Sequence, residues 1–442
     1  MAISTPPGRG GIGIVRLSGA EARQIAESLL RLKHPLEAGR SRFAHVMDVS
    51  TRAVLDEAVV TFFVAPNSYT SEDVIEIAAH GAPVLLDYLL RQCMAAGARI
   101  AEPGEFTQRA FLAGRLDLTQ AEAVRSLIDA TTMQQARTAA QQLGGGLSHE
   151  VQPVKRKLIE LIAALEAGVD FAEDDLELMP DEEIAQRLRA IDTPLRALEE
   201  SFKYGRVLRE GFRLAIVGRP NAGKSSLFNR LIGRDRAIVT AQPGTTRDPV
   251  YERMEISGIP VELIDTAGLR TTVDEAESYG IAKSREAMAE SDVVLLVIAA
   301  NENLHAEDFA AIEGALGRKL IVVVNKIDLV DKRVLSLTVE HLLTSAVDGT
   351  GIEELRRALM ETVHAVPHSA DTVPLTNIRQ HGAITAALQA LNSAQNGMKT
   401  AVPHEMLLLD LHECLNALDS LTGTTHTEEI LNLIFGSFCI GK

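Results

Sequence analysis

One stretch near the middle of the chain decides its fold: FRLAIVGRPNAGKSSLFNRLIG (212–233). The apolar run at its start predicts a buried strand, and SSLFNRLIG (225–233) predicts a helix. Between them, Gly218–Ser225 fits the pattern G-x-x-x-x-G-K-[ST], whose backbone N–H groups surround phosphates at the start of a helix. In that pattern Lys224 pairs with the β- and γ-phosphates, and the Ser225 hydroxyl binds Mg²⁺. The alternative is a chance match in a glycine-rich turn.

More apolar runs follow, and helix-forming segments separate most of them: VELID (261–265), VVLLVIAA (293–300), LIVVVNK (320–326) and LLTSA (342–346). Strands buried on both faces that alternate with helices are typical of a doubly wound parallel sheet. Before and after this α/β unit, apolar residues recur at helical spacing, as in the stripe Leu158, Leu161, Ile162 and Leu165. We therefore expect an α/β domain inserted into a helical one. The first third, with short apolar runs and turn signals, predicts a further mixed α/β domain.

Polar motifs end these runs. Asp265-Thr-Ala-Gly268 places a carboxylate where it can meet Mg²⁺ through water, and the loop PGTTRD offers the hydroxyls of Thr245 and Thr246. Asn325-Lys-Ile-Asp328 supplies a carboxylate that accepts two N–H bonds from guanine, which adenine cannot offer. Ser345-Ala346 would add a backbone N–H for the guanine oxygen. Four such elements in this order predict a GTPase.

The residue after DTAG departs from Ras-type enzymes, which have a water-orienting glutamine there. Leu269 cannot orient the attacking water, so another group must act. Arg247 is either a charge-neutralising finger or a solvated loop residue, and a monovalent cation held by Asn221 is the other route. The candidates for orienting water, or alternatively for a solvated loop, are Asp274, Glu275 and Glu277.

Composition limits the class of protein. The chain has 442 residues, which suggests roughly three domains, and its formal charge of −16 argues against broad nonspecific binding to nucleic acid or anionic membrane. Residues 1–115 hold 12 basic and 12 acidic side chains, so the whole excess lies beyond them. Three widely spaced cysteines indicate a reducing compartment. The N-terminus does not resemble a signal peptide, and the apolar runs are far shorter than the roughly 20 residues that span a bilayer.

The two ends of the chain carry further motifs. TPPGRGGIGIVRLSG (5–19) and PGEFTQRAFLAGRLDLTQAEAV (103–124) are rich in glycine and arginine. They are either turns and helix starts or a pocket for an anionic ligand, with Arg16 and Arg115 as donors. Cys439, in the terminal FCIGK, is either a small buried hydrophobe, which chemistry alone favours, or a nucleophile.

Taken together, these motifs resemble the MnmE (TrmE) family of tRNA-modification GTPases, over essentially the whole chain. The two end motifs, GRPNAGKSSLFN, PGTTRD, DTAGLR and NKID fall in the family's order. The resemblance implies an N-terminal folate-binding and dimerisation domain (1–115), a helical domain (116–210 with 366–442) and an inserted Ras-like domain (211–365).

The resemblance also assigns site residues. It places the folate contacts at Arg16, Glu76, Arg115 and Lys442, although many members carry Lys where this chain has Arg115. It makes Glu277 the water-orienting residue and Cys439 a candidate site beside folate and the substrate uridine, and it leaves Lys224 on the phosphates. The implied ligands of K⁺ are Asn221, Thr240, Gln242 and Thr245, and those of Mg²⁺ are Ser225 and Thr246.

The expected GTP contacts then come from the phosphate loop, the loop before PGTTRD, DTAG, NKID and the Ser-Ala pair. They are Asn221, Ala222, Gly223, Lys224, Ser225, Ser226, Thr240, Ala241, Gln242, Pro243, Gly244, Thr245, Thr246, Asp265, Thr266, Ala267, Gly268, Asn325, Lys326, Asp328, Ser345 and Ala346.

The reaction implied by the resemblance is modification of C5 of the wobble uridine (position 34) of certain tRNAs. It uses 5,10-methylene-tetrahydrofolate, with 5-formyl-tetrahydrofolate as an analogue, and an FAD-containing partner, MnmG (GidA), in a heterotetramer. A cytoplasmic homodimer would hydrolyse GTP to drive a conformational cycle. The tRNA contacts are then expected around the neutral N-terminal domain or on the partner. The rival readings are a stand-alone regulatory GTPase that binds RNA or the ribosome, and a folate-binding scaffold with a vestigial GTPase domain.

Overall fold

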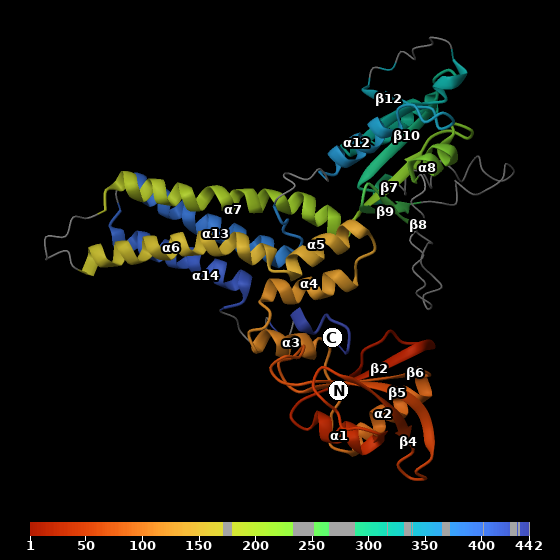
Figure 1. Cartoon of the computed structure of the whole chain (residues 1–442). Coiled ribbons are helices and arrows are strands. Elements are labelled where there is room, and N and C mark those ends of the chain that lie inside the picture. Colours follow the sequence, from red (N-terminus) through yellow and green to blue (C-terminus); the bar gives the residue numbers. More distant parts are fainter. Residues whose placement is uncertain are drawn as a thin grey trace. The chain divides into compact units, whose positions relative to one another are not determined.

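The computed structural model describes residues 1–170, 179–232, 252–264, 288–315, 317–330, 337, 339–364, 372–400, 402–424, 431 and 434–441 (Figure 1). The chain divides into two compact units. The first comprises Met1–Arg125, Leu143–Ser148 and Asp419–Lys442, and the second comprises Ser126–Gln142 and His149–Leu418. Among the described helices, none has the length and apolar character that crossing a membrane requires. The four domain segments expected from the sequence stay a prediction.

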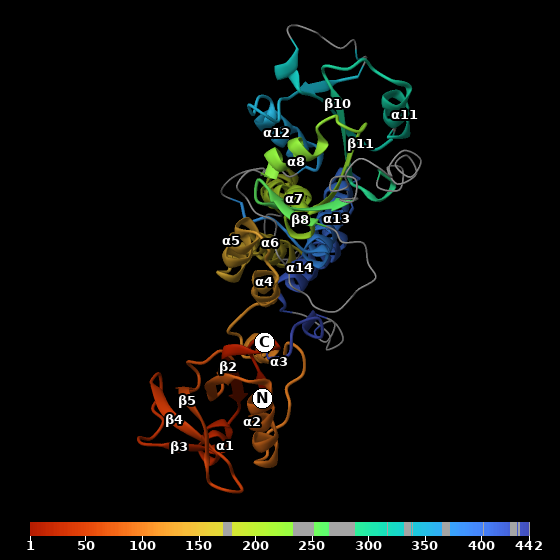
Figure 2. The same ribbon diagram turned by 90° about the vertical axis from the view of Figure 1, so that its right-hand side faces the viewer.

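The first unit is built on a six-stranded sheet in the order β1-β2-β6-β5-β4-β3, in which each pair is antiparallel. Along β2, Val15 and Leu17 are buried while Arg16 lies on the opposite face, because successive side chains of a strand alternate. Helices α1 (Ala22–Leu29) and α2 (Pro83–Ala95) cover the buried face (Figure 2). The strands are β1 (Ala2–Ile3), β2 (Gly10–Ser18), β3 (Leu30–Leu32), β4 (Ser41–Met47), β5 (Val54–Phe63) and β6 (Val74–Gly81). The predicted mixed α/β domain is confirmed.

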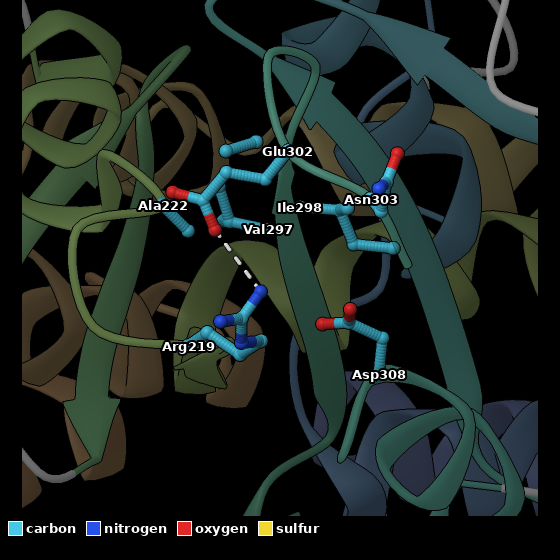
Figure 3. Close-up of a pocket in the computed structure, with 8 residues that line it drawn as sticks. Arg219, Ala222, Val297, Ile298, Glu302, Asn303 and Asp308 are labelled. Carbon is cyan, nitrogen blue, oxygen red and sulfur yellow. Dashed lines mark hydrogen bonds and ion pairs between the residues drawn. The ribbon is translucent and has the colours of Figure 1, made fainter. Parts of the chain in front are cut away.

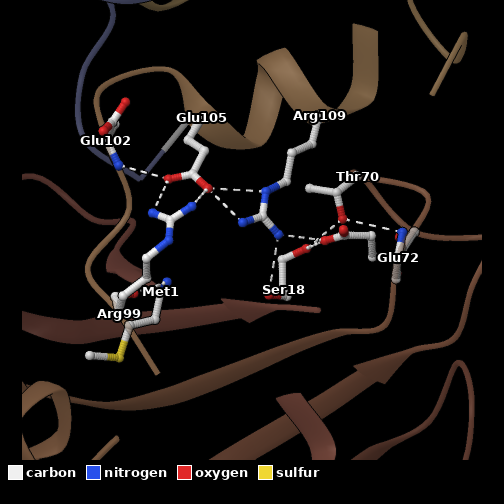
Figure 4. Close-up of polar contacts among 9 residues, drawn as sticks. Met1, Ser18, Thr70, Glu72, Arg99, Glu102, Glu105 and Arg109 are labelled. Atoms are coloured by element: carbon white, nitrogen blue, oxygen red, sulfur yellow. Dashed lines mark hydrogen bonds and ion pairs between the residues drawn. The ribbon is translucent and has the colours of Figure 1, made fainter. Parts of the chain in front are cut away.

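Helix α3 (Glu105–Leu112) is tied to this sheet by a network of charged side chains (Figure 4). The Glu105 carboxylate, 10% exposed, lies 2.5 Å from a guanidinium nitrogen of Arg99 and 2.5 Å from one of Arg109. It also accepts a hydrogen bond of 2.9 Å from the Glu102 N–H. Arg109 reaches on to Glu72 at 2.6 Å. The first residue of the helix is therefore held by two cations.

The second unit contains a helical part. Helices α6 (Gly146–Asp170), α7 (Asp181–Glu210), α13 (Ile378–Lys399) and α14 (His404–Thr422) supply most of it, after the shorter α5 (Met133–Leu143). The helix before them, α4 (Leu118–Ile128), lies largely in the first unit. The predicted stripe on α6 is confirmed, since Leu158, Leu161, Ile162 and Leu165 are all buried. Helices α7 and α13 pack together, with Thr385 Oγ1 donating to Glu199 Oε1 at 3.2 Å. Because these helices precede and follow the α/β part in sequence, the predicted insertion is confirmed.

The segment that leads back into the helices, residues 373–376, is buried in part and held by side chains from three helices. The N–H of Val373 donates to Glu150 at 2.8 Å, and the N–H of Leu375 donates to Ser201 Oγ at 3.1 Å. The carbonyl oxygen of Pro374 accepts a bond of 2.7 Å from Gln142 Nε2. Backbone groups without a regular secondary-structure partner are thus satisfied by side chains.

The α/β part has a six-stranded sheet in the order β12-β11-β10-β7-β9-β8. The five strands predicted from the apolar runs are present and pair in parallel, and β10 is buried along its whole length. They are β7 (Phe212–Val217), β9 (Ile259–Ile264), β10 (Val293–Ala299), β11 (Lys319–Asn325) and β12 (His341–Leu343), with helices α8 (Lys224–Ile232), α11 (Ala306–Gly314) and α12 (Ile352–Thr362) and the 3₁₀ turn η1 (Ile327–Leu329).

Strand β8 (Glu252–Ile256) was not predicted. It pairs antiparallel with β9 at the edge of the sheet, through the two-residue turn Ser257-Gly258, in which both residues have positive φ (51° and 85°). The Ser-Gly pair was a hairpin signal in the sequence.

The charged network of α3 predicts a dependence of stability on pH. Burial, the largest single influence, raises the pKa of Glu105, but hydrogen bonds from Arg99, the Glu102 N–H and Arg109 outweigh it and lower the pKa to about 2. A carboxyl group with a depressed pKa stabilises the fold above its unfolded value of about 4.3, and this contribution is lost as the pH falls toward 2. We expect Glu105→Gln to lower the free energy of unfolding at pH 7 by about 2 kcal/mol, and the difference from wild type to shrink between pH 5 and pH 2.

The measurement is guanidinium unfolding followed by circular dichroism at stepped pH. The matched control is Glu37→Gln, which removes an exposed carboxylate paired with Arg40 and Arg42 and should cost less than about 0.5 kcal/mol. A difference between Glu105→Gln and wild type that stays constant from pH 7 to pH 2 would contradict the assignment.

Candidate functional site

The phosphate loop lies between β7 and α8, as the sequence predicts. Gly218 has φ 141°, and a Cβ there would overlap the carbonyl oxygen of Val297 on β10. Gly223 has φ 90°, and a Cβ there would overlap the side-chain amide of Asn325. Between them Asn221 adopts the left-handed conformation, with φ 63°, which asparagine tolerates better than most residues. Both positions require glycine for two reasons: neighbouring atoms leave no room for a Cβ, and the backbone has a positive φ.

Lys224 begins helix α8 and turns back over the loop. Its ammonium group donates to the carbonyl oxygens of Gly218 and Arg219, both at 2.8 Å. Burial lowers the pKa of this ammonium below its usual range. A partly desolvated ammonium group at the start of a helix, beside backbone N–H groups, makes binding of an anion favourable. The loop therefore fits the phosphates of a nucleotide.

Asn325 joins the phosphate loop to the other end of the site. Its side chain is 1% exposed, and its Nδ2 donates to the carbonyl oxygen of Ala222 at 3.2 Å. Its Oδ1 accepts from the N–H of Ala346 at 3.2 Å and from the Thr344 hydroxyl at 3.3 Å. The structure thus brings together three of the predicted motifs on one buried amide.

Asp328 stands at the candidate base-binding end. It lies in η1, exposed, after Lys326, which has φ 66°. Its Oδ1 accepts a hydrogen bond of 2.7 Å from the hydroxyl of Ser345, which is fully buried. Ser345 therefore orients the Asp328 carboxylate, and the exposure of Asp328 leaves this carboxylate free to accept hydrogen bonds from the N–H groups of a guanine base. Ser226, on α8, is also exposed.

Several predicted residues lie outside the described part of the chain. They are Thr240–Thr246, Asp265–Gly268, Glu277 and Lys442, together with the alternatives Arg247, Leu269, Asp274 and Glu275. The predicted Mg²⁺ and K⁺ ligands among them, and the water-orienting role of Glu277, stay predictions.

A second candidate site lies in the first unit, on the face of the sheet opposite α1 and α2. Arg16 on β2 and Glu76 on β6 are register partners, and the guanidinium Nε and Nη2 lie 2.9 Å and 2.7 Å from Glu76 Oε1. Arg16 Nη1 also donates to the carbonyl oxygen of Gly441 at 3.2 Å, and the Ser4 hydroxyl donates to the same oxygen at 3.2 Å. The C-terminal motif therefore docks beside two of the predicted folate contacts.

The third predicted folate contact lies close by. The guanidinium of Arg115 stacks over the Tyr69 ring, 5.4 Å from its centroid, and donates to the carbonyl oxygen of Ser68. The guanidinium of Arg16 lies 5.8 Å from the same ring and 5.5 Å from the ring of Phe106. Cation–π contacts thus gather two guanidinium groups around the partly buried Tyr69 ring, and their charge fits an anionic ligand. Sequence reasoning missed Tyr69 and Phe106 as members of the site, although Phe106 lies within the segment 103–124 that it singled out.

Cys439 is exposed, so the interpretation of this residue as a small buried hydrophobe is wrong. Its carbonyl oxygen accepts from the Gly104 N–H at 3.4 Å, and the next residue bridges to Pro103. The anchoring of the terminal motif comes instead from Phe438, which is buried with Phe435 and Leu118. By contrast, Cys93 and Cys414 are buried, and burial raises the pKa of their thiols to about 11 and about 12.

Comparison with known proteins gives matches over nearly the whole chain. The family model described as "GTP-binding protein TrmE N-terminus" matches residues 1–115, and the model described as "MnmE helical domain" matches residues 118–439. The protein named tRNA modification GTPase MnmE from Koribacter versatilis is 54% identical, over 100% of this chain and 98% of its own length. The protein of the same name from Acetivibrio thermocellus is 40% identical over the same shares.

Among solved structures, the G domain of the FeoB iron transporter from T. maritima is 28% identical and covers 34% of this chain and 98% of its own. Era from Aquifex aeolicus, bound to GDP and aluminium fluoride, is 26% identical and covers 40% of this chain and 66% of its own. The TM-score is 0.26 in both cases, which is too low to support an inference.

The geometry at Asp328 predicts a switch of base preference. Asp328→Asn replaces one acceptor oxygen by a donor, so the guanine N–H groups lose a partner and a xanthine base gains one. We expect affinity for GTP to fall by at least about 100-fold and affinity for xanthosine triphosphate to rise, measured by competition with a fluorescent nucleotide.

The matched control is Asp292→Asn. Asp292 accepts a bond of 2.8 Å from the Arg213 N–H at the other end of the sheet, and asparagine can accept the same bond. Affinity for GTP should be unchanged in this control. An Asp328→Asn variant that binds GTP as wild type does would rule out the assignment of this residue to guanine.

Proposed function

Because the chain belongs to the MnmE family of tRNA modification GTPases, we propose that it hydrolyses GTP to drive modification of C5 of the wobble uridine in certain tRNAs. The observation that carries the proposal is the pairing of an assembled phosphate and base site in the second unit with the Arg16–Glu76 site in the first. A regulatory GTPase that only binds RNA has no use for the second of these sites.

We propose that the Arg16–Glu76 site holds a tetrahydrofolate carrier, which when bound supplies the one-carbon unit. Arg16 and Arg115 would bind its carboxylates or polar ring edge, and the partly buried Tyr69 would pack against its rings, with the buried Phe106 behind Tyr69. Glu76 orients Arg16 through two contacts to one oxygen. The exposed Cys439 would face the ligand or the uridine, together with Lys442.

Hydrolysis needs a water-orienting group, because Leu269 cannot act. We propose Glu277 for this role, K⁺ bound by Asn221, Thr240, Gln242 and Thr245, and Mg²⁺ bound by Ser225 and Thr246. Asn221 supports this, since it is exposed on the phosphate loop. The Ras-like domains of a cytoplasmic homodimer would meet face to face to bring Glu277 into place, and the FAD-containing partner MnmG would complete the tRNA-modifying complex.

The edge hairpin of the α/β sheet supports a conformational role for hydrolysis. Strand β8 follows the predicted K⁺ loop, and β9 leads into DTAG, so both nucleotide-sensing segments end on this hairpin. At its turn, the carbonyl oxygen of Gly258 accepts a hydrogen bond of 2.8 Å from Thr132 of the helical part, and the Gln134 side chain lies against the same glycine. A shift in either segment would be transmitted to α5 through this contact.

The tRNA itself tests the proposed function. In a strain that lacks the gene, nucleoside mass spectrometry should show loss of the 5-substituted wobble uridine, and the wild-type gene should restore it. Arg16→Ala should not restore it, although the purified variant should still hydrolyse GTP. Arg23→Ala, which removes a partly exposed arginine from α1, is the matched control and should restore the nucleoside. Unaltered tRNA in the deletion strain would refute the proposal.

The hydrolysis mechanism has its own test. Because Leu269 cannot orient water, GTP turnover should depend on Glu277 and on K⁺, and we expect Glu277→Ala to lower kcat by about 100-fold or more with little change in nucleotide affinity. Replacing K⁺ by Na⁺ should lower turnover of the wild type, whereas Asp274→Ala and Glu275→Ala should retain it. Equal rates in the two salts, or a fully active Glu277→Ala, would contradict the assignment.

A further inference from the structure

The phosphate loop carries an ion pair that the proposed function does not use. Arg219, the second residue of the loop, lies with its Nη1 3.0 Å from Glu302 Oε2 and its Nε 3.8 Å from Glu307 Oε2 (Figure 3). The side chain of Arg219 is 26% exposed and that of Glu302 is 36% exposed, whereas Glu307 is 63% exposed. Glu302 is therefore the principal partner.

Glu302 lies in the connection between β10 and helix α11. It lies in the turn after β10, which ends at Ala299, and its N–H donates to the carbonyl oxygen of Ala299 at 3.3 Å. Helix α11 then begins with a capping box, in which the buried Asp308 accepts from the His305 N–H at 2.9 Å. Arg219, Glu302 and Asp308 line a small pocket beside Ala222 and Val297. Because the Glu302 backbone is bonded to Ala299 at the end of β10, the ion pair connects Arg219 of the phosphate loop to β10.

The backbone of Arg219 contacts the functional lysine. The Arg219 carbonyl oxygen is one of the two that accept hydrogen bonds from Lys224, and it also accepts from the Ala222 N–H at 3.3 Å. Gly218, immediately before, lies against the Val297 backbone. The direction of the first half of the loop is thus set by the close approach at Gly218 and by the side chain of Arg219, while Asn325 holds the second half at Ala222.

We propose that Arg219 is a positioning residue for GTP, whose ion pair with Glu302 fixes the first half of the phosphate loop in the conformation that receives the phosphates. This rests on the proposed GTP hydrolysis. Arg219 acts through the loop backbone and Lys224, so it affects binding of the nucleotide and leaves the chemical step alone. The half-exposed pair is modest in strength, which corresponds to an effect of about fivefold on nucleotide affinity.

The experiment measures dissociation of a fluorescent guanosine diphosphate by stopped flow, with steady-state GTP hydrolysis, for the full chain. Arg219→Gln and Glu302→Gln should each raise the dissociation rate and KM about fivefold, with kcat within about twofold of wild type. The double variant should be no worse than either single one, because both remove the same interaction. Arg219→Lys, which keeps the charge, should recover part of the affinity, and Glu307→Gln should have a smaller effect.

The matched control is Arg213→Gln, which removes an ion pair of 3.2 Å with Glu262 at the opposite end of β7. Its nucleotide dissociation should equal that of wild type. Unchanged dissociation in both Arg219→Gln and Glu302→Gln, additive effects in the double variant, or an equal effect in the control would overturn the proposal. Tighter nucleotide binding by Glu302→Gln would also overturn it, since Glu302 would then restrain a cation that prefers the phosphates.

Circular dichroism establishes that each variant is folded, and Glu302→Gln tests the pair if Arg219→Gln is not. A wild-type chain that does not bind guanosine nucleotides would refute the proposed function, whereas nucleotide binding that is indifferent to both variants refutes only the role of Arg219.

Discussion

The buried amide of Asn325 is the interaction on which the nucleotide site depends. Its nitrogen and oxygen bond to groups in two different loops, Ala222 in the phosphate loop and Ala346 after β12; the first of these bonds is buried and the second is partly buried. Breaking one of these bonds would leave a polar group of the buried amide without a partner, which costs free energy. Separation of the two loops is therefore unfavourable. The phosphate end and the base end of the site are consequently parts of one rigid assembly carried by the parallel sheet.

The sequence was sufficient for the parts of the fold whose signals are local. The phosphate loop was predictable because glycine and lysine spacing reports backbone conformation and charge directly, and the apolar runs reported strands that are buried on both faces, such as β10. Strand β8 was missed because its sequence, ERMEI, has no continuous apolar run and its pairing is set by a two-residue turn. Here the useful signal was the Ser-Gly pair and not hydrophobicity.

The site in the first unit was harder to predict because its members come from distant parts of the sequence. Arg16, Tyr69, Phe106 and Gly441 are assembled by strand register and by docking of the terminal motif, neither of which sequence spacing reveals. The packing interpretation of Cys439 failed for a related reason. Phe438 anchors the motif in the core and its neighbour is left at the surface, a difference of one residue that depends on the direction of the chain.

The segment 373–376, which leads back into the helices, determines when during synthesis the helical part can complete its packing. The hydroxyl of Ser201 is bonded to the N–H of Leu375, which lies 174 residues later in the chain, and Gln142 and Glu150 await partners in the same segment. At translation rates of about 5 to 20 residues per second, these three side chains are made roughly 9 to 46 seconds before the segment that completes their packing. The whole of the α/β sheet, β7 to β12, is therefore synthesised before the segment that completes the packing of α5, α6 and α7.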